Sequence, residues 1–177
     1  MVLKIFFHGL IATVLLFNNS CSKENFPVDS SELTYRGKFV YNNQFKMNGI
    51  YYWDNINEGF VGLRYFFNDG TYYQVAIEDY KYSWECYQIN DRDIPYAWGC
   101  FIIEGDTLKV QTFDPTSRER YNKFKVEERW AKIENDSTIR FFKKITPEKK
   151  IVQLNETFKF HHCSNKPDSI NVLMKYL

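Results

Sequence analysis

Residues 61–77 read VGLRYFFNDGTYYQVAI, and this stretch decides the fold class. Apolar side chains recur at every second position on either side of Asn68-Asp69-Gly70. Such alternation is typical of strands with one buried face, and Asp-Gly between two such runs is a strong hairpin signal. We therefore expect an antiparallel hairpin with one face buried and the other in water. The side chains expected on the buried face are Val61, Leu63, Tyr65, Phe67, Tyr73, Val75 and Ile77.

Two further hairpins follow the same pattern. The first runs from Trp98 to Thr112 and turns at Glu104-Gly105-Asp106. The second runs from Phe124 to Phe141 and turns at Asn135-Asp136-Ser137. In its first strand we expect the apolar positions to be buried and the charged positions between them to face water. The apolar set is Phe124, Val126 and Trp130, and the charged set is Lys125, Glu127 and Arg129.

The number of strands and their tight turns predict a closed sheet. Many antiparallel strands in one domain must close or stack to protect their edges. We expect an all-β, antiparallel, up-and-down barrel of about eight strands. A sandwich is the alternative, and only residues 78–95 are irregular enough to hold the longer connection that it needs. Shorter alternating runs that add strands lie at 35–41, 50–53 and 158–162.

The C-terminus changes from strand-like to helical spacing. After Pro167, either Asp168 or Ser169 can cap a helix, and apolar residues follow at the spacing of one helical face. A short C-terminal helix is therefore expected to follow the barrel.

The N-terminus has the features of an exported protein. Residues 1–20 contain one positive charge, Lys4, followed by an apolar run and no acidic residue. This is typical of a secretory signal peptide, and the run is short for a membrane-spanning helix, which needs about 20 apolar residues. A buried strand or helix of the domain is the alternative. Ser20-Cys21 then fits a lipoprotein cleavage site, so Cys21 is the expected lipid attachment residue.

These signals divide the chain into a signal peptide (1–20), a polar tether (21–31) and a barrel domain (32–177). Each buried methylene of an acyl chain adds about 0.8 kcal/mol, so two or three chains would hold the protein on a membrane essentially permanently. Ser22, rather than an aspartate, follows Cys21, and by resemblance to bacterial sorting rules this implies a cell-envelope protein anchored at the outer membrane. Residues 1–20 hold one of the 23 basic residues and none of the 22 acidic ones, so the rest has no formal net charge. A nucleic-acid partner is not expected.

Several short motifs follow one another along the chain: the leader with Cys21, Asn48-Gly49-Ile50-Tyr51-Tyr52, Phe67-Asn68-Asp69-Gly70, Trp98-Gly99, Glu104-Gly105-Asp106-Thr107-Leu108, the run from Ile133 to Ile139, and Lys166-Pro167-Asp168-Ser169. Their order resembles that of small envelope lipoproteins of the Bacteroidota type with lipocalin-like barrels. Gly37-Lys38-Phe39 departs from the Gly-x-Trp with which a lipocalin begins its first strand. The resemblance implies a fold and a location, and it brings no established activity.

Three cysteines remain besides Cys21, an odd number for an oxidising compartment. Cys86 and Cys100 are the expected disulfide pair, because they flank one polar stretch that could bring them together. Three buried thiols that act as small apolar residues are the equal alternative.

Metal and catalytic sites are not expected. On a strand His161 and Cys163 face one side and His162 the other, too few ligands for a structural zinc site. Glycoside hydrolysis needs paired carboxylates, but spacing in sequence cannot fix their separation, and no nucleophile motif supports an enzyme. The acids that lie among aromatic residues are Asp79, Glu85, Asp91 and Asp93. We expect neither catalytic residues nor a cofactor.

Aromatic and acidic residues crowd the longest irregular stretch, and such residues form platforms for sugars, peptides or apolar ligands. The alternative is that they only seal one end of the barrel. We expect a lipoprotein that binds a small apolar or amphipathic ligand at this rim, or else a pocketless module that binds an envelope partner or glycan. The expected ligand-binding residues are Trp84, Tyr87, Asp91, Asp93, Tyr96 and Trp98.

Overall fold

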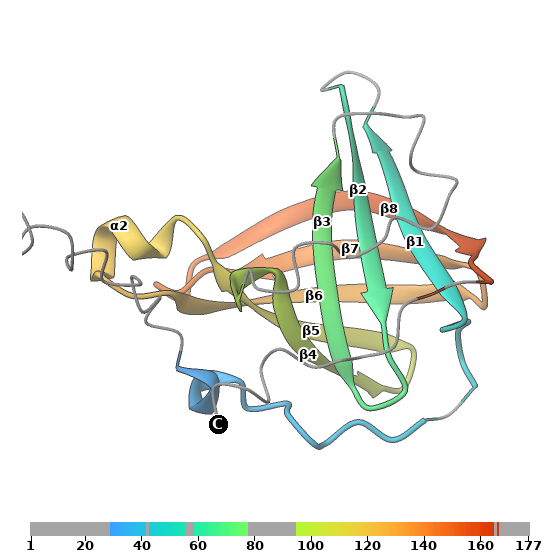
Figure 1. The fold of residues 1–177 in the computed structure, drawn as a ribbon, viewed down its shortest axis with the longest axis horizontal. Helices are drawn as coiled ribbons and strands as arrows, with labels where there is room; N and C mark the ends of the chain where they lie inside the picture. Colours follow the sequence, from blue (N-terminus) through green and yellow to red (C-terminus); the bar gives the residue numbers. More distant parts are fainter. Residues whose placement is uncertain (1–28, 42, 56–58, 78–94, 165, 167–177) are drawn as a thin grey trace, which may run out of the picture.

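The computed structural model describes residues 29–41, 43–55, 59–77, 95–164 and 166. Within them eight antiparallel strands follow one another in chain order around a closed barrel (Figure 1). The first strand also pairs with the last, so the predicted all-β, up-and-down barrel is confirmed. The strands are β1 (Gly49–Asn55), β2 (Phe60–Phe66), β3 (Thr71–Ile77), β4 (Trp98–Glu104), β5 (Thr107–Asp114), β6 (Lys125–Asn135), β7 (Thr138–Ile145) and β8 (Ile151–His162).

All three predicted hairpins are present. In the first, Tyr65 pairs with Tyr73, and the turn ends at Gly70 with a φ of +82°. A glycine is needed there because a Cβ at Gly70 would lie 2.6 Å from the Cβ of Phe39. The other two are β4–β5 and β6–β7. The predicted strand at 50–53 lies within β1, and the predicted strand at 158–162 is the C-terminal part of the longer β8.

Three short helical segments accompany the strands in the described part of the chain, one before β1 and two between strands. They are η1 (Ser30–Glu32), η4 (Pro95–Ala97) and α2 (Ser117–Tyr121). The carboxylate of Asp114 holds the turn before α2, where its Oδ1 accepts from the backbone N–H and the hydroxyl of Thr116, at 2.9 and 2.7 Å. The C-terminal helix predicted after Pro167 lies outside the described residues.

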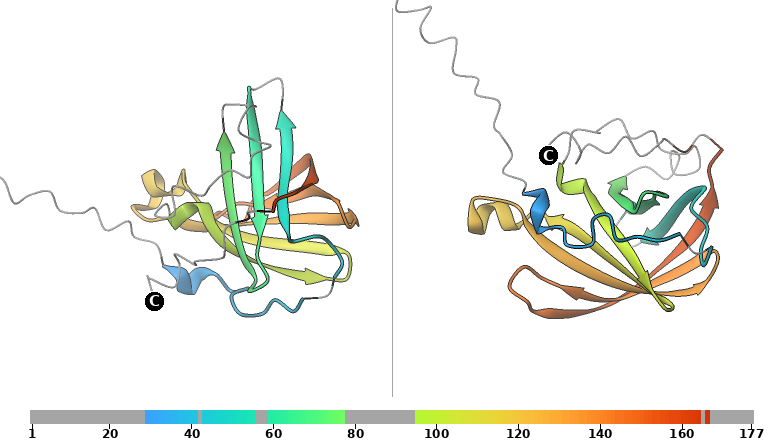
Figure 2. Two further views of the ribbon diagram at one scale, coloured as in Figure 1. Left: turned by 45° about the vertical axis from the view of Figure 1, so that its right-hand side comes forward. Right: turned by 90° about the horizontal axis from the view of Figure 1, so that it is seen from below.

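The predicted strand at 35–41 is wrong. The backbone N–H of Lys38 donates to the carbonyl of Tyr35 in a turn, and Gly37 has a φ of +68°. The side chain of Gln111 accepts from the backbone N–H of Tyr35 at 3.1 Å, which holds the segment against β5. Alternation here reflects side chains packed against the barrel, because the segment runs along the barrel without pairing as a strand (Figure 2).

Residues 45–47, which follow this segment in the chain, pack into one end of the barrel, which we call the plugged end. Phe45 and Met47 are buried there. The ring of Phe45 meets the ring of Phe66 edge-on with centroids 5.2 Å apart, and that of Phe101 at 6.2 Å. We call the core around these rings the inner cluster, whose buried members are Phe45, Met47, Tyr51, Phe66, Tyr72, Phe101, Leu108, Val110, Ala131, Ile133, Ile139, Phe141 and Phe158.

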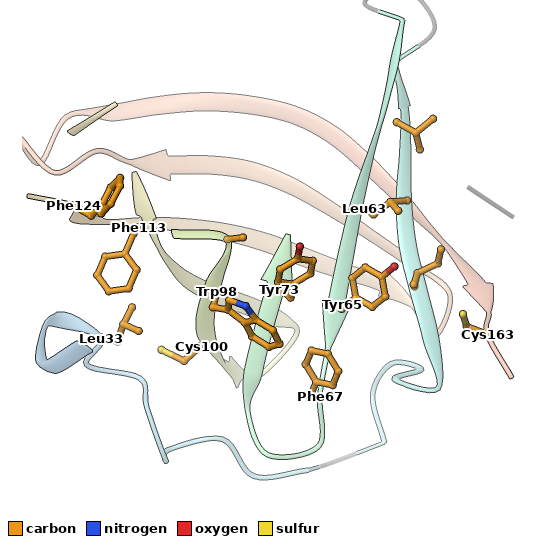
Figure 3. Packing of buried hydrophobic residues seen from close by; sticks show 13 residues of the cluster. Leu33, Leu63, Tyr65, Phe67, Tyr73, Trp98, Cys100, Phe113, Phe124 and Cys163 are labelled. Carbon is orange, nitrogen blue, oxygen red and sulfur yellow. The ribbon is translucent and has the colours of Figure 1, made fainter. Parts of the chain in front are cut away.

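A second core cluster covers the outer surface of β1 to β5 (Figure 3). Val61 and Leu63 belong to it, whereas Phe66 belongs to the inner cluster. Both faces of β2 are therefore buried, and the prediction that one face is in water is wrong for this strand. We call this second core the outer cluster, whose buried members are Leu33, Ile50, Val61, Leu63, Tyr65, Phe67, Tyr73, Ala97, Trp98, Cys100, Phe113, Phe124 and Cys163.

Candidate ligand site

The wall of the barrel opens between β3 and β4. Their paired residues run only from Thr71–Cys100 to Tyr73–Trp98, whereas β3 continues to Ile77. Beyond Tyr73 the two strands diverge, and η4 leads into β4 beside this opening (Figure 1).

A pocket of about 410 Å³ lies at the opening. Two arginines line it, and no acidic residue does so within the described part of the chain. We call it the β3 pocket, and it is lined by Arg64, Tyr73, Gln74, Val75, Ala76, Tyr96, Ala97, Pro115 and Arg129.

Arg64 is a buried cation on the inner face of β2, with 9% of its surface exposed. Its Nη1 donates to the carbonyl of Leu63 at 3.0 Å, and its guanidinium lies 4.9 Å from the ring centroid of Phe158. Among the described residues its Nε has no hydrogen-bond partner, and no carboxylate lies within ion-pair distance. Burial lowers the pKa of Arg64, the direction expected for a poorly compensated cation.

Arg129, by contrast, is paired. Its Nε donates to Glu127 at 2.8 Å, and its Nη1 lies 3.7 Å from Glu156. Glu127 also binds the Nζ of Lys144 at 2.5 Å. Burial lowers the pKa of Arg129, but its acidic neighbours, Glu127 first, outweigh burial and raise it.

The charges of this interior group do not balance. Among the described residues, Arg64, Arg129 and Lys144 face the carboxylates of Glu127 and Glu156, which leaves one positive charge. The ion pairs use Arg129 and Lys144, so the excess charge of this group resides at Arg64. The Arg64 side chain is buried, lines the β3 pocket and has a donor without a partner in the part of the chain that the structure describes.

The prediction that Glu127 and Arg129 face water is wrong. Glu127 is 2% exposed, and both side chains point into the barrel toward Arg64. The apolar positions at the start of this segment instead reach the outer cluster, where Phe124, just before β6, is buried and Val126 packs against the cluster. Alternation identified the two faces of the strand, but it could not say which of them lines the interior when both are covered.

A larger hollow of about 570 Å³ lies beside β6, but its chemistry is different. Part of its charged lining is paired, as the Nζ of Lys125 binds Glu32 at 2.8 Å. The Nε2 of Gln111 also donates to Glu128, at 3.3 Å. We place the candidate site at the smaller β3 pocket, because an uncompensated charge marks it.

The predicted ligand-binding residues separate in the structure. Tyr96 lines the β3 pocket. Trp98 is 1% exposed in the outer cluster, where its ring packs 4.8 Å from Tyr73 and 6.0 Å from Phe67 (Figure 3). The remaining four predicted residues, Trp84, Tyr87, Asp91 and Asp93, lie outside the described residues, as does the predicted lipid attachment residue, Cys21.

The predicted disulfide between Cys86 and Cys100 is wrong, because Cys100 is a free, buried cysteine. Its thiol faces the outer cluster and contacts the Oε1 of Gln111 at 4.0 Å. Cys163, on the other hand, is disulfide-bonded. Cys86 itself lies outside the described residues. The position of the two cysteines on either side of a polar stretch did not predict their pairing, because β4 directs the Cys100 side chain into the packed apolar side chains of the outer cluster.

The Cys100 thiol should resist alkylation in the folded protein. Burial raises its pKa to about 12, so the reactive thiolate is a fraction of roughly 1 in 10,000 at pH 8. Peptide mapping after iodoacetamide treatment should find Cys100 unmodified in native protein and modified after unfolding in urea. Equal labelling in the two states would contradict the buried position.

The described residues show neither a metal site nor a membrane-spanning helix. No group of three or more histidine, cysteine or acidic side chains is placed to hold a metal ion within the described residues. None of the helices in that part of the chain is long and apolar enough to cross a membrane.

Comparisons with protein-family profiles, with curated proteins and with solved structures found no match.

Proposed function

We propose that this chain is a lipid-anchored protein of the cell envelope that binds a small amphipathic molecule in the β3 pocket. The observation that carries the proposal is a concave, mostly apolar pocket with a buried arginine in its wall, whose Nε has no hydrogen-bond partner among the described residues. Ligand sites are commonly clefts of about 300–1,000 Å³ with apolar walls and a few fixed polar groups. The volume and lining of the β3 pocket support this function over the pocketless alternative.

The apolar part of the pocket is preformed. Tyr73 and Ala97 are buried members of the outer cluster, and Tyr96 packs against it with its ring 5.3 Å from that of Phe124. Because these side chains are already fixed by packing, a ligand would lose little free energy in ordering them.

A neutral fluorescent probe tests the pocket itself. N-phenyl-1-naphthylamine should bind the parent protein and brighten, and Ala76→Trp should weaken that binding at least tenfold by filling the pocket. Gln153→Trp is the matched control, because Gln153 is exposed on β8 and does not line the pocket. Equal binding by the two variants would place the probe elsewhere and contradict the proposal.

Cys21→Ala tests the anchor. If the Cys21 sulfur carries the acyl chains, the variant should move from the membrane pellet to the aqueous fraction, since each buried methylene contributes about 0.8 kcal/mol. Fractionation with a high-salt wash measures the change, and retention of the variant in the pellet would refute the lipid anchor.

The disulfide offers an independent check. Cys163 is disulfide-bonded, and a Cys21 sulfur that carries lipid as a thioether cannot be its partner. Peptide mapping without reduction would contradict the anchor if it joined Cys21 to Cys163.

A further inference from the structure

We infer that the β3 pocket selects amphiphiles with a singly charged carboxylate head group, and that Arg64 binds this carboxylate. The inference rests on the proposed ligand-binding function and adds the chemical class of the ligand. It comes from the interior charges and from the geometry of the opening between β3 and β4.

The first argument is the state of Arg64 without a ligand. A guanidinium has five N–H donors and stays charged, and its burial is costly without an anion nearby. The structure gives Arg64 one carbonyl acceptor and one aromatic face, and leaves its Nε unpartnered among the described residues. A carboxylate can accept two parallel hydrogen bonds from a guanidinium. An anionic head group would supply the missing partner.

The second argument concerns the charge of the ligand. Counted over the described residues, the interior group carries one excess positive charge, and the carboxylates of Glu127 and Glu156 already neutralise Arg129 and Lys144. A monoanion would make the group neutral. A phosphate dianion would leave excess negative charge near Glu127 and Glu156, and like charges in a poorly solvated interior repel strongly.

The third argument is the path that the hydrocarbon chain of the ligand would take from Arg64 to the surface. Arg64 lies on the inner face of β2, whereas Val75 and Tyr96 line the pocket from the outer-cluster side. Ala76 is exposed at the end of β3, so the pocket leads from the buried cation to the surface. A ligand with its carboxylate at Arg64 would lay its hydrocarbon chain along the small and aromatic side chains of the opening.

Binding of three amphiphiles with the same twelve-carbon chain tests the selectivity. Dodecanoate, dodecanol and dodecyl phosphate are titrated calorimetrically into the whole mature protein at pH 8, below the concentrations at which they form micelles. We expect dodecanoate to bind at least tenfold more tightly than either of the others, a difference of about 1.4 kcal/mol.

Arg64→Met should abolish the preference for dodecanoate while retaining the binding of dodecanol. Arg140→Met is the matched control, because Arg140 is an exposed arginine paired with Glu134 at 2.7 Å. It should bind all three amphiphiles as the parent does. Replacing a buried, uncompensated cation with an apolar residue is often neutral or stabilising, so Arg64→Met should also keep or raise the melting temperature.

Arg64→Lys provides a second variant, which keeps the positive charge but loses the planar guanidinium that can donate two parallel hydrogen bonds to a carboxylate. Its preference for dodecanoate should be smaller than that of the parent. Two results would overturn the inference while leaving the proposed function standing. One is equal binding of dodecanoate and dodecanol by the parent, and the other is an undiminished preference in both Arg64 variants. If neither the neutral probe nor any of the three amphiphiles bound, the proposed function would fail as well.

Discussion

Gly99→Ala should destabilise the protein by more than about 4 kcal/mol, among the largest effects of a single substitution. A Cβ at Gly99 would lie 2.0 Å from the backbone oxygen of Gln111 and 2.9 Å from the Cγ2 of Thr112. Gly99 pairs with Thr112 in the β4–β5 ladder, so neither backbone can move aside without breaking hydrogen bonds of the barrel wall. Urea unfolding followed by circular dichroism measures the loss.

Gly62→Ala is the matched control for this substitution. Gly62 also lies in the middle of a strand, but a Cβ there would meet nothing closer than 3.6 Å, from the ring of Trp53. Its effect should stay below about 1 kcal/mol, the usual range for a substitution without strain. If Gly99→Ala were as stable as Gly62→Ala, the close pairing of β4 with β5 would be wrong.

Trp98→Ala should cost about 3–5 kcal/mol, as expected when a large aromatic side chain is removed from a packed core. Trp98 is 1% exposed, and its ring packs against Tyr73 and Phe67 at the point where β3 leaves β4. The substitution should loosen the wall of the β3 pocket as well as the core. The melting temperature and the free energy of unfolding measure the effect.

Trp98→Phe separates the packing of this side chain from its indole N–H. That N–H has no hydrogen-bond partner among the described residues, so its removal should cost little. We expect a loss of about 1 kcal/mol, since a smaller ring still fills most of the space. A Trp98→Ala variant as stable as Trp98→Phe would show that the ring does not support the outer cluster.

The strand order could be predicted from the sequence because its signals are local. Gly70 and Gly105 lie in turns and have positive φ, and the alternation around these turns fixes the register of the two hairpins. Consecutive hairpins without long connections leave an up-and-down closure as the simplest arrangement.

The location of the site could not be predicted in the same way, because it depends on which strand face lines the interior. Val61 and Leu63 look like the buried face of a strand with one side in water, yet they pack outside the barrel while Arg64 points inward. A charged residue within an otherwise apolar strand was the available signal. Whether Arg64 is compensated depends on Glu127 and Glu156, which are distant from it in sequence and meet Arg129 only in the closed barrel.

The cysteines show the same limit. Cys86 and Cys100 flank one polar stretch, but the pairing of cysteines depends on distances between strands. Cys100 lies buried in the outer cluster, with a free thiol.

A crystal structure of the mature protein with dodecanoate tests the central claim most directly. We predict density for the ligand in the β3 pocket, with a carboxylate oxygen within hydrogen-bond distance of the Arg64 Nε and the chain leading past Ala76 to the surface. Density for dodecanoate at another site, with the β3 pocket filled only by water and the Arg64 Nε bound to no ligand atom, would contradict the account.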